Sequence, residues 1–275
     1  MMAERTADIQ DHWTRPGVLA RIDAVLTELG HDPQNLTPEI LATVDHLHSG
    51  GFATTRDQAD GIILTPQSRV LDVGCGTGGP ARYLAHTYGC QVDGIDLTPE
   101  LIETGKILTE RCGLAGHVRL QLGNALDLPY LDQTFDVVWC QNVTMNIADK
   151  TGFLASVYRV LKPGGLFTAT EYSVGPGGAI IFPVPWAYEP SINFLDAEDV
   201  MRARYRATGF RISECNDYSQ TVIKNYEQTL SAPPNKLTTK LVFGDDTPDR
   251  QRNSQRNLIE RRIIYWMIIA ERPKS

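Results

Sequence analysis

The sequence predicts an α/β protein built on a doubly wound sheet, and three observations support this fold class. From Arg69 onward, short apolar segments alternate with segments of helical periodicity, a pattern typical of a parallel sheet with helices on both faces. A glycine-rich turn over residues 74–79 follows the first apolar segment. The 275 residues are 42% hydrophobic and 21% charged, so the chain can bury a core of ordinary size.

Two helices are expected before the sheet begins. Apolar residues recur at the spacing of one helix face from Val18 to about Gly30, and a second helix is predicted over Thr37–His46. A minimal sheet of this class needs neither helix. We therefore interpret residues 1–60 as an N-terminal helical lid and residues 61–275 as the domain that contains the sheet.

The first half of the sheet is predicted from short apolar strands that alternate with helices. Strands are expected at Val70–Val73, Gln91–Ile95, Val118–Leu122 and Phe135–Trp139. One helix begins at Pro80, after the glycine-rich turn. Another begins at Thr98-Pro99-Glu100 and ends near Gly113, because threonine can cap a helix, proline suits its first position and glutamate suits its positive end.

The second half of the sheet begins with a helix whose apolar face runs from Phe153 to Leu161. The turn Lys162–Gly165 ends this helix and leads into a fifth strand that continues through Tyr172. Residues 174–190 are rich in glycine and proline, and they are predicted to form an ordered excursion over the edge of the sheet.

The C-terminal part is predicted to complete the sheet. Asp196 can cap a helix that ends near Gly209, and two last strands are expected at Phe210–Cys215 and Arg262–Ala270. Insertions are therefore expected at about 173–195 and 218–249. The second insertion shows only weak periodicity.

Composition excludes several classes of protein. The net charge of −7 argues against nucleic-acid binding, which depends on clustered lysines and arginines. The basic cluster Arg250–Arg262 is interrupted by polar residues and is interpreted as a solvated helix face. The longest apolar segment, Ile263–Ala270, is too short to span a membrane.

The cysteines and the N-terminus indicate the setting of the protein. Five cysteines without a Cys-x-x-Cys pair fit a reduced, cytoplasmic environment. The polar N-terminus lacks the apolar core of a signal peptide. No cluster of residues has the spacing of metal ligands, so no metal site is predicted.

The glycine-rich turn predicts a ligand site between the first strand and the first helix, because glycines let a ligand approach the backbone. Gly74, Gly76 and Gly79 satisfy the dinucleotide fingerprint G-x-G-x-x-G, and Asp96 lies about where a ribose-binding acid is expected. The motif alone therefore leaves a nicotinamide-dependent oxidoreductase open.

Three polar residues shift the interpretation toward a different ligand. Asp72 lies directly before the glycines, where it would repel a pyrophosphate but attract the ammonium group of a methionine moiety. Asp96 ends the second strand and can accept both ribose hydroxyl protons. Asn124 follows the third strand and offers an amide oxygen to an adenine amino group.

Four segments then resemble, in chain order, the successive motifs of class I S-adenosylmethionine-dependent methyltransferases. They are Val70–Gly79, Gly94–Thr98, Phe135–Val138 and Leu161–Gly165. The resemblance covers about Trp13 to Arg272, and it is to the small-molecule branch with ubiquinone/menaquinone-type, sarcosine/dimethylglycine and phosphoethanolamine enzymes. It implies a Rossmann-like seven-stranded sheet with an antiparallel last strand, and S-adenosylmethionine as the cofactor.

The resemblance also implies roles for individual residues in cofactor binding. Asp72 and Gly74 are expected near the methionine moiety, Asp96 and Leu97 at the ribose, Asn124 and Ala125 at the adenine, and Gln141 beneath the methionine end. The usual residue at the position of Asn124 is aspartate. Residues 46–51 resemble the segment that closes over the cofactor in phosphoethanolamine methyltransferases, and Trp13 stands where those enzymes place an aromatic lid residue.

Candidates for the acceptor site follow the carboxyl ends of the strands, where doubly wound sheets bind ligands. They are Asn142, Met145, Asn146, Tyr172, Trp186 and Tyr188. Glu171 is a candidate general base if burial raises its pKa, with a hydrogen-bond partner for the lid backbone as the alternative. His48 is the second candidate for moving a proton, ahead of His12 and His46. Trp186 and its aromatic neighbours can equally be packing under a loop.

The aromatic lid favours an apolar or aromatic small-molecule acceptor, such as a specialised metabolite. An amine such as sarcosine or dimethylglycine is the alternative, although no arginine in residues 174–190 is placed to bind its carboxylate. A non-catalytic module that binds S-adenosylmethionine is the alternative outside enzymes. The sequence defines neither the oligomeric state nor whether a nitrogen, oxygen or carbon atom is methylated.

Overall fold

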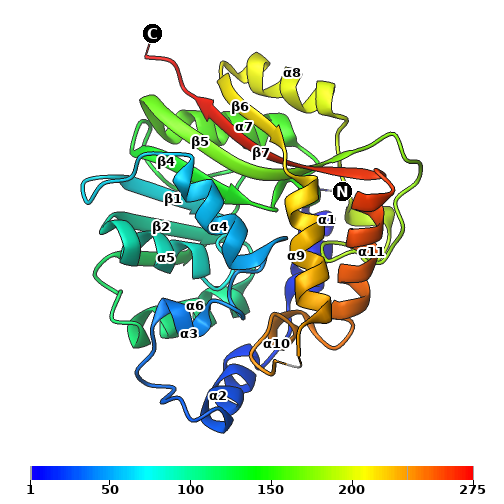
Figure 1. Cartoon of the computed structure of the whole chain (residues 1–275). Coiled ribbons are helices and arrows are strands. Elements are labelled where there is room, and N and C mark those ends of the chain that lie inside the picture. Colours follow the sequence, from blue (N-terminus) through cyan, green and yellow to red (C-terminus); the bar gives the residue numbers. More distant parts are fainter. Residues whose placement is uncertain (1, 234, 275) are drawn as a thin grey trace.

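A seven-stranded sheet lies at the centre of the protein, with the strand order β3-β2-β1-β4-β5-β7-β6 (Figure 1). The computed structural model describes residues 2–233 and 235–274. The strands are β1 (Arg69–Val73), β2 (Gln91–Asp96), β3 (Val118–Leu122), β4 (Phe135–Gln141), β5 (Leu161–Val174), β6 (Arg211–Asp217) and β7 (Ile263–Glu271). Strands β1 to β5 pair in parallel, whereas β7 is antiparallel to β5 and β6. The predicted fold class is therefore confirmed.

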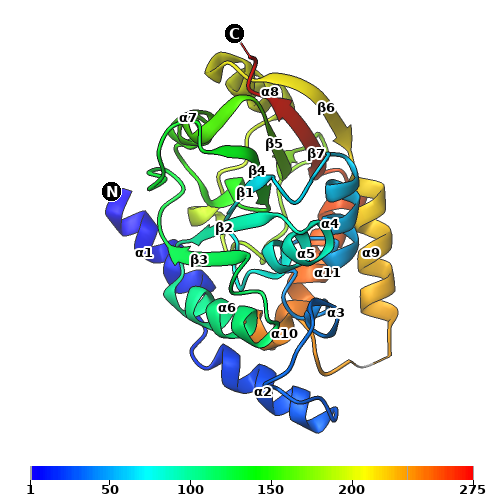
Figure 2. The ribbon, with the colours of Figure 1, turned by 90° about the vertical axis from the view of Figure 1, so that its left-hand side faces the viewer.

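Helices cover both faces of the sheet (Figure 2). On one face, α4 (Gly51–Asp60), α5 (Gly79–Tyr88) and α6 (Pro99–Arg111) bury apolar residues against β1 to β3. On the other face, α7 (Lys150–Val160) and α8 (Glu198–Thr208) pack on β4, β5 and β7. Because both faces are covered, β1 and β4 are almost entirely buried and consist mainly of apolar residues.

Helices from both ends of the chain meet beyond the carboxyl ends of the parallel strands. The N-terminal group is α1 (Met2–Trp13), α2 (Val18–Glu28) and α3 (Pro38–Leu41), and the C-terminal group is α9 (Ser219–Ser231), α10 (Lys240–Phe243) and α11 (Thr247–Ile259). Short turns η1 (Thr144–Asn146) and η2 (Pro190–Ile192) lie beside them. Helices α2, α3 and α10 share one apolar cluster, and the ring centroids of Trp13 and Phe243 are 5.4 Å apart.

Several local predictions differ from the structure. The helix predicted over Thr37–His46 is limited to α3 (Pro38–Leu41), since the chain then turns so that Asp45 and His46 lie buried in the interior. Helix α8 begins after Ala197 rather than at a cap from Asp196, whose carboxylate instead accepts a hydrogen bond from Arg204 Nε at 2.8 Å.

The weakly patterned insertion at 218–249 is largely helical, and α1 was not predicted either. The basic cluster is carried by α11, but it is not wholly solvated. Arg250 is buried, donates to the carbonyl oxygen of Phe243 at 2.7 Å and lies 5.2 Å from the centre of the Tyr188 ring. A long polar side chain can thus face the interior when backbone carbonyls accept its protons.

Trp186 anchors the segment that follows β5. Its side chain is fully buried, its ring centroid lies 4.6 Å from that of Tyr172, and its indole N–H donates to Asn193 Oδ1 at 2.7 Å. The carbonyl oxygen of Trp186 accepts from Asn146 Nδ2 at 3.0 Å. Residues 174–197 are therefore held by packing and hydrogen bonds together.

Truncation of this anchor is expected to destabilise the protein. Trp186→Ala should lower the free energy of unfolding by about 3–5 kcal/mol, because it removes a fully buried aromatic side chain. Urea titration followed by circular dichroism measures the change. Leu131→Ala, at a side chain that is 84% exposed, serves as the control and should change little. Equal stability of Trp186→Ala and the wild type would contradict the packing role.

Candidate active site

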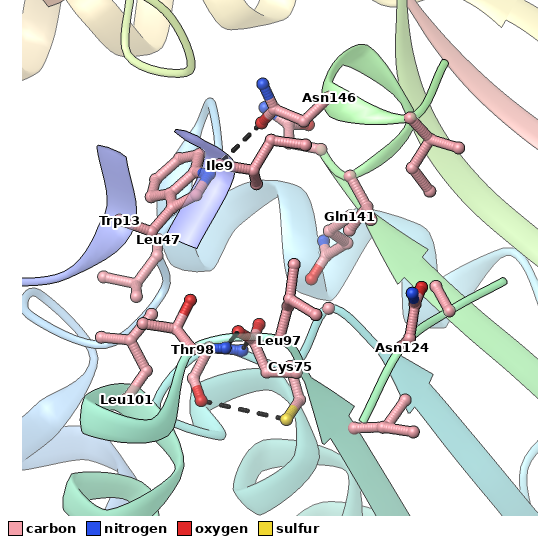
Figure 3. A pocket seen from close by; sticks show the side chains of 18 of the residues that line it. Ile9, Trp13, Leu47, Cys75, Leu97, Thr98, Leu101, Asn124, Gln141 and Asn146 are labelled. Carbon is pink, nitrogen blue, oxygen red and sulfur yellow. Dashed lines mark hydrogen bonds between the residues drawn. The ribbon is translucent and has the colours of Figure 1, made fainter. Parts of the chain in front are cut away.

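A cavity of about 640 Å³ lies at the carboxyl ends of the parallel strands, within the size range of small-molecule sites. Residues that follow β1, β2, β3 and β4 line it, together with residues of α1 and of the segment before α4. Figure 3 shows Trp13 and Leu47 on the side of the cavity opposite Asn124, with Leu97 and Gln141 between them. The sheet thus brings predicted cofactor residues from distant parts of the sequence into one wall.

The glycine-rich turn leaves no room for side chains at its key positions. Gly74 has a φ of 74°, and a Cβ atom there would lie 2.2 Å from Val143 Cγ2. A Cβ atom on Gly79 would lie 2.3 Å from the carbonyl oxygen of Asp45. The turn is therefore closely packed between the segment after β4 and the segment before α4.

Asp96 closes this turn from the end of β2. Its Oδ2 accepts from the Gly76 N–H and its Oδ1 from the Thr98 N–H, both at 2.9 Å. Each carboxylate oxygen has a further lone pair, so Asp96 can still accept hydroxyl protons from a ligand. Burial raises the pKa of Asp96, and these backbone hydrogen bonds act in the opposite direction.

Asp72 is the strongest electrostatic feature of the cavity. Its side chain is 1% exposed, and Oδ2 has no hydrogen-bond partner among the described residues. Burial raises its pKa to about 8, and the charge of Asp96 acts in the same direction. A cationic group of a ligand would satisfy this oxygen and favour the ionised carboxylate.

Helix α1 covers the cavity through hydrogen bonds at two places. Trp13 Nε1 donates to Asn146 Oδ1 at 3.3 Å (Figure 3), and Gln10 Nε2 donates to the carbonyl oxygen of Leu97 at 2.8 Å. Asn146 in turn donates to the carbonyl oxygens of Trp186 and Ile192. Trp13 therefore lies over the cavity, as expected of a lid residue.

Every residue predicted to bind the cofactor lines this cavity. They are Trp13, Asp72, Gly74, Gly76, Asp96, Leu97, Asn124, Ala125 and Gln141. Asn124 uses Oδ1 to accept from the Leu126 N–H at 2.9 Å, which leaves one lone pair of that oxygen. Gln141 is buried with no hydrogen-bond partner for Nε2 among the described residues.

The predicted acceptor residues are only partly brought together. Asn142 and Asn146 line the cavity, whereas Met145, Tyr172, Trp186 and Tyr188 do not. Met145, Tyr172 and Trp186 are buried in the apolar cluster behind the cavity wall. Tyr188 is 43% exposed and accepts a hydrogen bond from Arg15 at 3.0 Å.

The two predicted proton-transfer residues lie in different places. His48 lines the cavity. Glu171 lies outside it, on the face of the sheet that α8 covers, where its carboxylate accepts a hydrogen bond from Tyr205. Burial raises the pKa of Glu171, as the sequence-based argument required, but β5 continues past it to Val174 instead of ending near the cavity.

Some cavity residues were missed from the sequence. Asp45, Val143 and Phe194 all line the cavity, and none belongs to a motif recognised in the sequence. The only available signal was their position, in segments that precede α4 or follow β4 and β5. Asp45 pairs with the buried Arg82 of α5 at 2.7 Å, a contact between residues 37 positions apart.

Fold and site together define the class of protein. The strand order with an antiparallel β7 is the class I methyltransferase fold, and the cavity lies at the carboxyl ends of the strands, where open α/β sheets bind ligands. Residues 71–169 match the family described as a methyltransferase domain. The chain is therefore similar in sequence to methyltransferases.

Curated relatives act on different acceptors. The chain is 40% identical over 223 residues to the glycine/sarcosine/dimethylglycine N-methyltransferase of Actinopolyspora halophila, covering 80% of this chain and 40% of that protein. It is 32% identical over 177 residues to the 2-methyl-6-phytyl-1,4-hydroquinone methyltransferase of Synechocystis, covering 62% of this chain and 52% of that protein. The chain thus spans about half the length of these relatives, or less.

A solved structure shares the fold over nearly the whole chain. The geranyl diphosphate C-methyltransferase of Streptomyces coelicolor superposes with a TM-score of 0.71, covering 98% of both chains at 18% sequence identity. Helices α1 to α3 and α9 to α11 therefore belong to an arrangement that occurs in another protein of this fold.

The unpaired Asp72 predicts a pH dependence of stability for the ligand-free protein. Because its pKa of about 8 exceeds the unfolded value of about 3.9, the folded state binds the proton more tightly. This stabilisation is full below about pH 4 and is lost as the pH rises through 8. Thermal melts from pH 6 to pH 9 should show a larger loss of stability for the wild type than for Asp72→Asn. Parallel curves for the two proteins would contradict this assignment.

Proposed function

We propose that the chain transfers a methyl group from S-adenosylmethionine to a small-molecule acceptor. The observation that carries this proposal is the unpaired, buried Asp72 carboxylate beside the glycine-rich turn and Asp96. Asp72 offers an oxygen to the ammonium of the methionine moiety, the turn admits the ligand close to the backbone, and Asp96 accepts ribose hydroxyl protons. The apolar side chains of Leu97, Leu101 and Ala125 can flank an adenine ring.

The same observation argues against a dinucleotide. A pyrophosphate at this turn would meet the carboxylates of Asp72 and Asp96 without a compensating cation. Asp45, Asp72, Asp96 and Asp149 line the cavity, and its described lining contains no lysine or arginine. Like charges in a buried site are unfavourable, so the proposal excludes the nicotinamide-dependent oxidoreductase.

This chemistry places modest demands on the protein. S-adenosylmethionine supplies a methyl group that its sulfonium already activates. The chain must hold the acceptor in line with the transferred carbon and exclude water. Trp13 and Ile9 cover the cavity, and Gln141 and Asn142 form the wall at the end of β4. A cavity covered by a lid and extended beyond the glycine-rich turn supports catalysis over mere cofactor binding.

We propose a neutral acceptor with apolar or aromatic character. Apolar side chains line much of the cavity, among them Trp13, Val143, Ile147 and Phe194. A carboxylate or phosphate on the acceptor would lack a cationic partner among the described lining residues. The similarity to a glycine/sarcosine/dimethylglycine enzyme favours a small amine as the second candidate, since carboxylates attract an ammonium group.

The proposal includes a cytoplasmic setting, which the five free thiols support. No helix in residues 2–233 and 235–274 is long and apolar enough to cross a membrane. Within the same residues, no group of three or more metal-binding side chains is found.

Cofactor binding is the first test. Calorimetry should show that S-adenosylmethionine and S-adenosylhomocysteine bind the wild-type protein at micromolar concentration. Asp96→Ala should weaken both by more than about tenfold, because it removes the ribose acceptor and the hydrogen bond to Gly76. Asp132→Ala, at a carboxylate that is 70% exposed and outside the cavity lining, is the matched control. Absence of binding to the wild type would overturn the proposed function.

The acceptor is tested with a panel of compounds that differ in charge. A hydroquinone, catechol, a primary alkylamine, sarcosine and phosphoethanolamine are each incubated with the protein and S-adenosylmethionine, and mass spectrometry detects the added methyl group. Turnover should be highest for the neutral phenols, because the described cavity lining contains no cationic side chain. Preference for sarcosine or phosphoethanolamine would contradict the neutral acceptor but not methyl transfer itself.

A further inference from the structure

A chain of polar side chains runs from His48, in the cavity wall, to Asp45. His48 Nε2 and His46 Nδ1 each lie 2.9 Å from the hydroxyl oxygen of Thr55 on α4. His46 Nε2 lies 3.8 Å from Asp45 Oδ1. Thr55, His46 and Asp45 are at most 3% exposed, so bulk water does not screen these contacts.

The number of protons available to these side chains sets the direction of the hydrogen bonds between them. A threonine hydroxyl has one proton, so between two ring nitrogens it donates to one and accepts from the other. Asp45 Oδ1 has no hydrogen-bond partner among the described residues, whereas Oδ2 pairs with Arg82. If His46 directs its Nε2–H at Asp45 Oδ1, its Nδ1 carries no proton and accepts the Thr55 hydroxyl proton. The Thr55 oxygen then accepts the Nε2–H of His48.

This arrangement leaves His48 Nδ1 without a proton. The carbonyl oxygen of Ser49 lies 3.4 Å from Nδ1 and accepts a hydrogen bond only once Nδ1 is protonated. Gln141 Oε1 also lies 3.4 Å from the Thr55 hydroxyl, a longer contact than either histidine makes. Of the two histidines in this hydrogen-bonded series, His48 lines the cavity, and the unprotonated nitrogen thus belongs to it.

We propose, resting on the methyl transfer proposed above, that His48 takes the proton of a hydroxyl or amine acceptor and that Thr55 and His46 position it as the base. The acceptor's O–H or N–H bond breaks as its lone pair forms a bond to the methyl carbon. The carbon–sulfur bond breaks, and its electron pair remains on the now neutral sulfur. The acceptor proton moves to His48 Nδ1, while the Nε2 proton shifts through Thr55 to His46 and toward Asp45.

The surroundings of His48, Thr55 and His46 keep both histidine rings neutral, as a group that passes a proton on requires. Burial lowers the pKa of His48 and of His46 to about 3, with Arg82 adding to the effect on His46. Both rings are therefore neutral between pH 5 and 9. Tyr172, Tyr226 and Tyr265, which surround Ser49, stay protonated because burial raises their pKa values.

Nitrogen-15 NMR of the ligand-free, full-length protein labelled at histidine tests the chain without any acceptor. We expect both rings to be neutral from pH 5 to 9, with His48 protonated at Nε2. Asn substitution of each histidine assigns its signals. Thr55→Val should shift the tautomer populations of both rings, whereas Thr55→Ser should preserve them. Protonation of neutral His48 at Nδ1, or identical spectra for Thr55→Val and the wild type, would overturn the relay.

Kinetics test the role of the chain in turnover, with whichever panel compound is methylated. Thr55→Val should lower kcat about 100-fold, leave the affinity for S-adenosylmethionine within twofold, and make the rate rise with pH as the acceptor ionises by itself. Thr55→Ser should restore most of the rate. Thr54→Val is the matched control, because the neighbouring Thr54 hydroxyl is buried without a partner among the described residues.

The outcomes separate the two proposals. A wild-type rate in Thr55→Val, or an equal loss in Thr54→Val, would overturn the relay while methyl transfer stands. No binding and no transfer by the wild-type protein would overturn the proposed function, whatever the NMR spectra show. A flat loss of rate at all pH values in Thr55→Val would indicate a structural role and would also overturn the relay.

Discussion

The buried carboxylate of Asp72 is the constraint on which the site depends. Strand β1 lies between β2 and β4, and Asp72 is in register with Gly94 and Trp139, so no neighbouring strand residue supplies a cation. An ionised carboxylate in such surroundings costs several kcal/mol unless it is paired. The ligand-free protein meets this cost by holding the group protonated, as its raised pKa indicates. A ligand with a cationic group would remove the need for that proton, which is why the proposed function assigns this oxygen to the ammonium group of the methyl donor.

Helix α1 covers part of this cavity and contacts two of its walls. Gln10 of α1 binds the carbonyl oxygen of Leu97, next to Asp96, while Trp13 binds Asn146 near the segment after β5. One helix therefore contacts both the expected cofactor side and the expected acceptor side. The start of α2 is tied to α6, because Glu100 accepts from the backbone N–H groups of Gly17 and Val18 at 3.0 and 3.1 Å. Displacement of α1 would thus alter both walls of the cavity at once.

The parts of the site that the sequence predicted are those carried by local motifs. The turn after β1, Asp72 and Asp96 follow from strand ends and glycine spacing, which a linear pattern records. Glu171 and Tyr172 were placed at the acceptor site because β5 was expected to end at Tyr172. The strand continues to Val174, which bridges Ala197, so both side chains lie within the sheet and under other elements. Strand length and the cover over a strand are set by tertiary packing, and no local pattern reveals them.

The same limit explains why Thr55 and Asp45 were not singled out. Each is an ordinary residue in the sequence, and its chemistry comes from neighbours brought together by folding: two imidazole rings around Thr55, and Arg82 beside Asp45. Methyl transfer to a neutral acceptor consumes the positive charge of a sulfonium and releases a proton into an enclosed space. A cavity lined by aspartates and without a lysine or arginine among its described residues suits both stages. Under the proposed mechanism, its carboxylates attract the cationic donor before transfer and Asp45 receives the shifted proton afterwards, so the same group of aspartates contributes to binding and to proton removal.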